Sequence, residues 1–163
     1  MPPWLPPLIC LAAFGGDWRR YEEALYRVFC RDFIGGGLTF GGIPVRLKRH
    51  PLSAGKEATF WHLISEGAEE AERIPDMRRC ERIGWPKAVI EHAGDPAVLS
   101  WENERRHGER RACLWVEEED YLLVLALRSG YVLPWTAYLV QRDHQKAKLR
   151  RELEEFRRRQ RQP

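Results

Sequence analysis

No run of apolar residues in this chain approaches the ~20 residues that a membrane-spanning helix requires, so we expect no membrane segment. The N-terminal stretch MPPWLPPLICLAAFGG is apolar, but no basic residue precedes it and prolines interrupt its start. A secretory signal peptide combines a basic n-region with an unbroken apolar stretch, and we therefore expect none here. Residues 1–16 are instead predicted to form a proline-rich arm of the domain.

Cysteine is sparse and widely spaced. The four cysteines are Cys10, Cys30, Cys80 and Cys113, and no two of them form a C-x-x-C pair. Structural zinc sites use closely spaced pairs, and disulfide frameworks are usually denser and belong to smaller chains. The pattern therefore predicts reduced thiols in a cytoplasmic protein.

Motifs for nucleotides and metals are also missing. There is no P-loop, no G-x-G-x-x-G follows a predicted strand, and the glycines between Gly35 and Gly42 are better explained by turns. No carboxylates, cysteines or histidines cluster with the spacing of metal ligands. We expect neither a nucleotide-binding enzyme nor a metal or other cofactor.

The chain of 163 residues, 44% of them apolar, is sufficient for one domain with a substantial core. The net charge is only +3, but residues 142–163 hold nine Lys or Arg against four Asp or Glu, a local charge of +5. Such a segment suggests a polyanion partner, although a solvated amphipathic helix is the commoner cause of a basic run. Residues 157–163 are predicted to be a basic, frayed tail.

The strongest structural signal is the segment Tyr121–Val140, in which two apolar runs flank the turn dipeptide Ser129-Gly130. β-Branched and aromatic residues at this density predict a β-hairpin with both faces largely buried. Pro134 has no N–H to give to a ladder, so the second strand is either an edge strand or bulged at that point.

The register of this hairpin decides where its polar residues lie. With a two-residue loop alone, Arg128 faces Tyr131, and Thr136 and Tyr138 lie on the opposite face of the sheet. A three-residue loop, or a bulge at Pro134, places Arg128, Thr136 and Tyr138 on one face. We favour the second arrangement because it gathers the polar groups of the hairpin onto one surface.

The remaining patterns predict an α+β fold, with N-terminal helices packed on a four-stranded antiparallel meander sheet and a basic C-terminal helix. Residues 59–65 are interpreted as a buried strand, although a segment so short also fits a helix. The other predicted elements are a helix over 17–33, two short strands within 38–48, a helix from Pro75 divided by Gly84 and Pro86, strands over 97–105, 110–117, 121–128 and 131–140, and a helix over 142–159.

Several short motifs occur in a meaningful order. They are KEATFWHLISE at 56–66, PDMRRCERIGW at 75–85, YLLVLALR at 121–128 and TAY at 136–138, followed by the basic helix. Together, over roughly residues 38–156, they resemble the phage-associated barnase/EndoU/colicin/RelE-like (BECR fold) nucleases. The resemblance implies a small metal-independent ribonuclease of toxin or phage-conflict type, with RNA, such as tRNA, as its target and a cognate antitoxin or inhibitor protein as a further partner. A fold alone does not decide activity.

Metal-free RNA cleavage needs a base for the ribose 2′-OH, an acid for the leaving 5′-oxygen, and cations for the phosphorane charge. His62 is the only polar interruption of its apolar segment and is the best candidate for either the acid or the base, although a hydrogen-bonded core histidine fits equally well. Arg82 and Arg128 are candidates for the cationic part. Thr136 and Tyr138 could bind a phosphate or orient the acid–base group, although half-buried packing is the commoner role of such a tyrosine.

Candidates for RNA binding are basic or aromatic. Lys56 opens the first motif and Arg79 lies on the predicted helix of the second. Trp85, next to a helix break, is the candidate for an exposed base-stacking face, although tryptophans pack in cores more often. Lys146 and Lys148 of the last helix could track the phosphate backbone.

Two functions therefore follow from the sequence. The first is a metal-independent endoribonuclease that cleaves RNA by attack of the 2′-OH on the phosphodiester. The second is a non-catalytic module for RNA or protein binding on the same fold, in which His62 is structural and the basic helix supplies the affinity.

Overall fold

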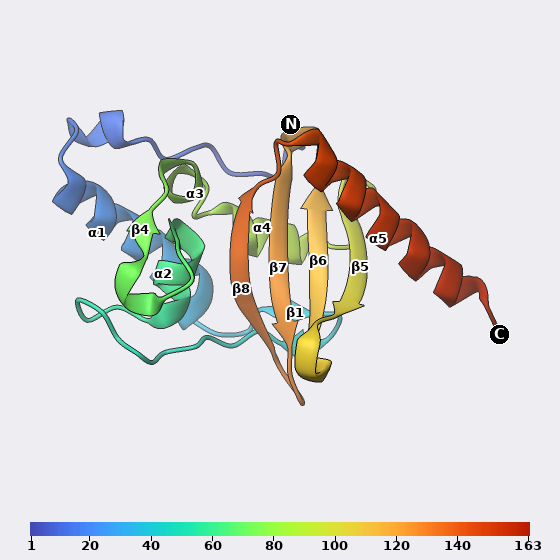
Figure 1. Ribbon diagram of the computed structural model, residues 1–163. Helices are drawn as coiled ribbons and strands as arrows, with labels where there is room; N and C mark the ends of the chain where they lie inside the picture. Colours follow the sequence, from blue (N-terminus) through green and yellow to red (C-terminus); the bar gives the residue numbers. More distant parts are fainter.

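The computed structural model describes all 163 residues and has the predicted α+β architecture. Its centre is a four-stranded antiparallel meander in the order β5-β6-β7-β8. These strands are β5 (Leu99–Glu104), β6 (Arg110–Val116), β7 (Tyr121–Leu127) and β8 (Val132–Leu139). The long helix α5 (Asp143–Arg161) lies across one face of the sheet, and the earlier helices pack against the other face and beside β8 (Figure 1). None of the helices combines the length and the apolar character needed to cross a bilayer.

The N-terminal half consists of short elements. They are α1 (Trp18–Phe29), a wider π-type turn (Cys30–Ile34), β1 (Thr39–Phe40), β2 (Ile43–Pro44), α2 (Ala58–Ile64), β3 (Ser65–Glu66), β4 (Ile74–Pro75), α3 (Met77–Glu81) and α4 (Trp85–Glu91). β1 pairs with β2 and β3 pairs with β4, each as a separate two-stranded ribbon. The predicted first helix, the paired strands around Gly41-Gly42 and the division of the second helical segment are confirmed.

Helix α1 forms where its capping residue and apolar stripe predict it. The Asp17 side chain accepts a hydrogen bond from the backbone N–H of Arg20 at 3.3 Å, which satisfies one of the free donors of the first turn. Tyr21, Leu25 and Phe29 recur at helical spacing and are fully buried. The helix is thereby fixed against the core by a single face.

The interpretation of residues 59–65 as a strand is wrong, because Ala58–Ile64 form the helix α2. All but one of its seven residues are buried. A helix that is buried nearly all round shows neither the period of an amphipathic helix nor the alternation of a strand. Tertiary packing between α3 and β8, and not local pattern, selects its conformation.

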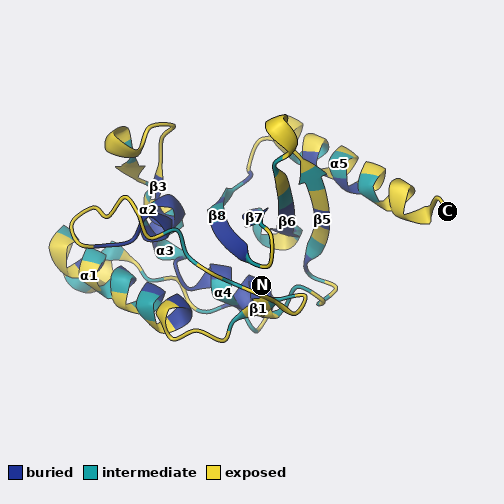
Figure 2. Cartoon of the chain, turned by 90° about the horizontal axis from the view of Figure 1, so that it is seen from below, coloured by how far each residue is buried: buried dark blue, intermediate teal, exposed yellow.

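The two faces of the sheet bury different cores. On one face, alternate residues such as Leu114, Leu123 and Leu125 pack against the N-terminal helices. On the other, a smaller cluster centred on Trp101, Trp115, Leu122 and Val124 packs under Leu149 and Leu153 of α5. Because α5 touches the sheet mainly over β5, the part of this second face toward β8 is not covered by it (Figures 1 and 2).

The hairpin β7–β8 has a two-residue loop and also a bulge. The N–H of Arg128 donates to the carbonyl of Tyr131 at 3.0 Å, which closes the loop. Leu125 is paired with Pro134 but Val124 with Thr136, so one extra residue is inserted between them. The bulge returns Thr136 to the face of Val124, which by alternation is also the face of Arg128 and Tyr138. The favoured arrangement of the polar residues is confirmed.

Both ends of the chain belong to the domain. Leu5 of the proline-rich arm is buried, and the ring of Trp4 stacks on His92 with centroids 4.4 Å apart. At the other end, α5 continues to Arg161 in place of the expected frayed tail, and its last turns project beyond the sheet (Figure 1). All four cysteines are free thiols.

Candidate active site

A hollow of about 360 Å³ lies beside β8, where α2, α3 and the β3–β4 ribbon meet the bulge. Its polar lining includes His62, Glu70, Lys48, Arg79 and Thr136, and Trp135 supplies the aromatic part. His62, Arg128, Thr136 and Tyr138 were predicted to share one surface. The structure brings His62 and Thr136 to one hollow, whereas neither Arg128 nor Tyr138 lines it.

The start of α2 is built on the chain that leads to Lys48. The backbone N–H groups of Ala58 and Thr59 donate to the carbonyls of Arg49 and Lys48, at 3.1 and 3.0 Å, so donors that a helix N-terminus leaves free are satisfied by this chain. The hydroxyl of Thr59 also accepts the N–H of Lys48 at 2.8 Å. These bonds fix the backbone of Lys48 next to the helix that carries His62.

His62 forms a close pair with Glu70. Its Nε2 lies 2.6 Å from Oε1 of Glu70, and the ammonium of Lys48 lies 3.5 Å from the same oxygen. His62 Nδ1 makes no hydrogen bond with the protein. With Nε2–H donated to Glu70, the lone pair of Nδ1 is the one free to accept a proton.

The environment keeps His62 neutral and Glu70 ionised. Burial is the main cause that lowers the pKa of His62; the charges of Arg73 and Lys48 act in the same direction and together outweigh the opposing effect of Glu70. For Glu70, burial alone would raise the pKa of the carboxyl, but its hydrogen bond with His62 and the positive charges around it bring the pKa below its ordinary value. The two lowered pKa values favour a neutral imidazole that donates to a carboxylate. This is the arrangement of an oriented general base.

Arg73 holds the β3–β4 ribbon in place over the end of α2. Its guanidinium donates to the carbonyls of Ser65 at 2.6 Å and Gly67 at 2.7 Å, and its Nε donates to the hydroxyl of Ser65 at 3.1 Å. A cation at the C-terminal end of a helix satisfies free carbonyls and complements the helix dipole. Arg73 thus positions the largely exposed ribbon that carries Glu70 (Figure 2).

Arg79 connects α3 with β8. Its guanidinium donates to the carbonyl of Ser65 at 2.9 Å and to Oγ1 of Thr136 at 3.2 Å, and it lies 5.4 Å from the ring centroid of Tyr138. Asp76 caps α3 and lies 3.7 Å from Nε of Arg79. Burial raises the pKa of Tyr138, so its phenol is neutral at physiological pH.

Trp135, the residue that the bulge inserts, forms one wall of the hollow. The edge of its ring meets His62 with centroids 5.5 Å apart, and Lys48 lies 5.9 Å from its centroid. The guanidinium of Arg128 is also 5.9 Å from this ring, outside the hollow. Arg128 is therefore next to the candidate site without lining it.

Arg82, Lys56 and Trp85 lie elsewhere. Arg82 packs over the ring of Trp85 and donates to the carbonyl of Arg78 at 3.0 Å. Lys56 is buried against α1, with its ammonium 2.9 Å from Glu23. Neither Arg82 nor Lys56 lines the hollow.

The prediction that Trp85 is an exposed stacking face is wrong. Only 1% of this residue is exposed, its ring packs against Tyr121 at 5.1 Å, and its indole N–H donates to the carbonyl of Pro6 at 2.9 Å. At the helix break the proline-rich arm packs over Gly84, with Pro6 as the contact residue. The arm therefore covers the ring of Trp85 instead of leaving it open to solvent.

Lys146 and Lys148 are on α5, which packs over β5, at the far end of the sheet from the hollow (Figure 1). Lys146 is paired with Asp120 at 2.7 Å, whereas Lys148 is exposed. The basic helix is thus a second charged surface and not a wall of the candidate site.

The lining residues that the sequence did not single out include Lys48, Glu70, Arg73 and Trp135. Glu70 stands in an acidic run that is typical of a solvated loop. The usable signal for Trp135 was the neighbouring Pro134, because a proline inside a strand marks a bulge, and bulges re-aim side chains at functional sites.

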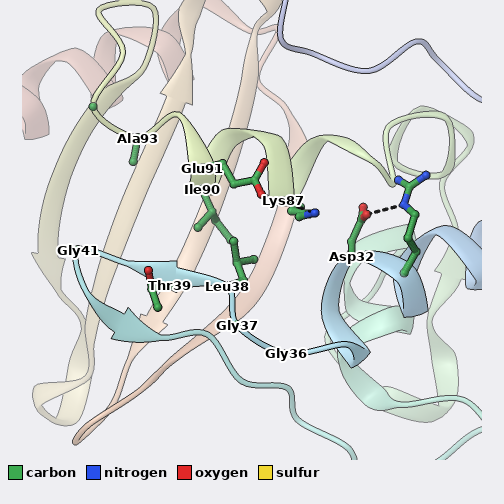
Figure 3. A pocket seen from close by; sticks show the side chains of 12 residues that line it. Asp32, Gly36, Gly37, Leu38, Thr39, Gly41, Lys87, Ile90, Glu91 and Ala93 are labelled. Carbon is green, nitrogen blue, oxygen red and sulfur yellow. Dashed lines mark hydrogen bonds and ion pairs between the residues drawn. The ribbon is translucent and has the colours of Figure 1, made fainter.

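A larger hollow, of about 620 Å³, lies between the glycine-rich turn after α1 and helix α4 (Figure 3). Its charged residues are largely paired among themselves: Arg31 with Asp32 at 2.9 Å, and Lys87 with Glu91 at 3.6 Å. It holds no histidine, and none of the predicted catalytic residues reaches it. For these reasons the hollow at His62 is the better candidate for chemistry.

Comparison with known protein families, with curated proteins and with solved structures found no match to this chain. What the candidate site can do therefore follows from its own geometry. No group of three or more His, Cys, Asp or Glu side chains is arranged to hold a metal ion.

Proposed function

We propose that the chain is a metal-independent endoribonuclease whose active site is the hollow at His62. The observation that supports this most directly is the imidazole of His62, held by Glu70 at 2.6 Å in a hollow that also contains Lys48 and Arg79. An oriented base next to cations is what attack by a ribose 2′-OH on a phosphodiester requires.

In the proposed reaction Nδ1 of His62 accepts the proton of the 2′-OH while the 2′-oxygen attacks phosphorus. Glu70 stabilises the imidazolium that forms, and the guanidinium of Arg79 stabilises the charge on the phosphorane oxygens. The bond to the 5′-oxygen then breaks. Lys48 is the lining residue that can give this oxygen a proton, because arginine does not release one.

The alternative is RNA binding without cleavage on the same surface. It is favoured by the deep position of His62, whose side chain is only 9% exposed, so that a ribose would reach it only through the open side of the hollow. In this case the His62–Glu70 pair stabilises the fold, as buried polar groups usually do when satisfied.

Incubation of the purified protein with single-stranded RNA and with tRNA in EDTA tests the proposal. We expect products with a 2′,3′-cyclic phosphate and no cleavage of DNA or of RNA with 2′-deoxy substitution at the cut site. His62→Ala should lower the rate by about two to four powers of ten. His144→Ala is the matched control, because this exposed histidine of α5 lies outside the hollow.

Two outcomes would decide against the proposal. Cleavage that stops in EDTA and returns with magnesium would indicate a metal nuclease. Tight binding of RNA with no cleavage of any substrate would support the binding module. In cells, a toxin of the proposed type should arrest growth when expressed without an inhibitor protein, and His62→Ala should relieve the arrest.

A further inference from the structure

Two arginines lie close to the ring of Trp135 without lining the hollow. Arg111 of β6 lies 5.5 Å from the ring centroid and Arg128, at the end of β7, lies 5.9 Å from it. His62 and Lys48, which line the hollow, lie 5.5 and 5.9 Å from the same ring centroid. Trp135 is therefore next to both the proposed catalytic groups and a second pair of cations on the sheet.

Arg111 and Arg128 converge on one carboxylate. Nη2 of Arg111 lies 3.1 Å from one oxygen of Glu109, and Nη2 of Arg128 lies 3.5 Å from the other. The Nε of Arg111 is buried and has no hydrogen-bond partner. Two guanidinium groups thus share a single negative charge and leave one positive charge uncompensated, which is the arrangement of an anion site with an internal carboxylate in it.

This group lies on the part of the sheet that α5 leaves free. Arg111 is paired with Ala126 and lies on the same face of the sheet as Cys113 and Val124. It is two residues along β6 from Cys113, which belongs to the core under α5. Arg111 and Arg128 keep 19% and 31% of their side chains exposed, so a ligand can reach them from solvent. The ring of Trp135 lies close to both Arg111 and His62, at centroid distances of 5.5 Å each.

We propose that Trp135, Arg111 and Arg128 form a subsite for the nucleotide next to the scissile phosphate of a single-stranded RNA. The unpaired base stacks on the indole, and the adjacent phosphate replaces Glu109 between the two arginines. The inference rests on the proposed function for the identity of the neighbouring phosphate, but binding in the subsite requires no cleavage.

Single-stranded RNA is the substrate class that this geometry favours. A base can stack on a protein ring only when it is unstacked from its neighbours, and in a duplex its π-face is covered. Stacking on an aromatic ring accepts any base, so the subsite confers selectivity for strandedness more than for sequence.

Anisotropy of a labelled, fully 2′-O-methylated oligonucleotide measures the subsite apart from chemistry, because its blocked 2′-oxygen cannot attack. The double variant Arg111→Gln/Arg128→Gln should bind this single strand more weakly and flatten the slope of log affinity against log salt by about 0.7, because one phosphate is no longer neutralised. Trp135→Ala should weaken binding roughly tenfold, whereas Trp135→Phe should retain most of it.

Glu109→Gln gives the opposite expectation. With the internal carboxylate neutralised, both arginines are free for phosphate, so affinity should rise and the salt slope should become steeper. A variant that is merely misfolded would not bind more tightly. The matched controls are Glu102→Gln and Arg110→Gln. These two residues form an exposed ion pair at the same end of the meander as Glu109, but on the opposite face of the sheet from Arg111. These controls should change binding little.

The subsite is overturned if Glu109→Gln binds no more tightly than Glu102→Gln, or if Arg111→Gln/Arg128→Gln binds like Arg110→Gln. Equal affinity for a duplex and a single strand would overturn the proposed preference for single-stranded RNA. If the expected binding pattern appears but no RNA is ever cleaved, the subsite stands and the ribonuclease assignment fails. If His62-dependent cleavage is unaffected by all of these variants, the assignment stands and the subsite fails.

Discussion

Arg79 of α3 donates a hydrogen bond to Oγ1 of Thr136 in β8, at 3.2 Å, although the two residues are 57 positions apart in the chain. The same guanidinium bonds the carbonyl of Ser65 at the end of α2. One side chain therefore joins the helix that carries His62, the helix α3 and the bulged strand. The candidate site depends on this connection because its walls come from distant parts of the sequence.

Thr136→Val tests the connection by removing the hydroxyl at nearly constant volume. We expect the free energy of unfolding to fall by about 1 kcal/mol, because Arg79 no longer has this partly buried acceptor. If Arg79 stabilises the phosphorane, kcat/KM should fall as well, since the guanidinium is less well oriented. Urea unfolding and cleavage kinetics measure the two effects. Thr39→Val, on exposed β1, should change neither; a Thr136→Val protein with normal stability and kinetics would show that the bond is dispensable.

If the chain cleaves RNA as proposed, the pH dependence of cleavage should follow the lowered pKa of His62. A base works only when deprotonated, so kcat/KM should fall on the acid side with a midpoint below the ordinary histidine value of 6.5. Glu70 acts to raise this pKa, so Glu70→Gln should move the midpoint to still lower pH and also reduce the plateau rate. A pH–rate profile of both proteins checks this. An acid limb that moves upward in Glu70→Gln would contradict the pairing of His62 with Glu70.

Trp85 should behave as a core residue. Trp85→Ala should cost about 3–5 kcal/mol in the free energy of unfolding, and RNA affinity measured on the remaining folded protein should be unchanged. Trp85→Phe should cost less in packing but leave the carbonyl of Pro6 without its donor. Chemical denaturation gives the stability change. A stable Trp85→Ala protein with weakened RNA binding would restore the role of an exposed stacking face.

The basic helix α5 can contribute to RNA binding only through its unpaired cations. Lys146 and Arg150 are engaged with Asp120 and Glu117, whereas Lys148 and Arg151 are exposed. If α5 contacts phosphates, changing Lys148 and Arg151 to Gln should flatten the salt dependence of single-strand binding by about 1.4 units, and changing the paired residues should do less. Equal slopes for all of these variants and the unaltered protein would leave α5 as a solvated face.

The sheet was predictable from sequence because its strands carry local signals. The alternating and apolar runs around Ser129-Gly130, together with Pro134, led to the meander, the hairpin and the bulge. Helix α2 was not predictable because nearly all of its residues are buried, and a fully apolar segment has no visible period.

The candidate site was predictable only in part. His62 and Thr136 were conspicuous as polar residues in apolar segments, and the structure brings them together. Glu70, Lys48 and Arg73 reach the same hollow through long-range contacts, such as the ion pair of Lys48 with Glu70 and the bonds of Arg73 to Ser65. Such contacts follow from the tertiary arrangement and leave no pattern in the local sequence.

The chain that leads to Lys48 also closes one border of the sheet. Val45 forms a parallel bridge with Val132 of β8, the N–H of Arg46 donates to the carbonyl of Val132 at 2.8 Å, and α2 and α3 flank the rest of this strand. A foreign strand therefore has no free backbone to pair with along the start of β8. An inhibitor protein that binds by extending the sheet would have to add its strand to β5, at the opposite border, and would leave the entrance at His62 open.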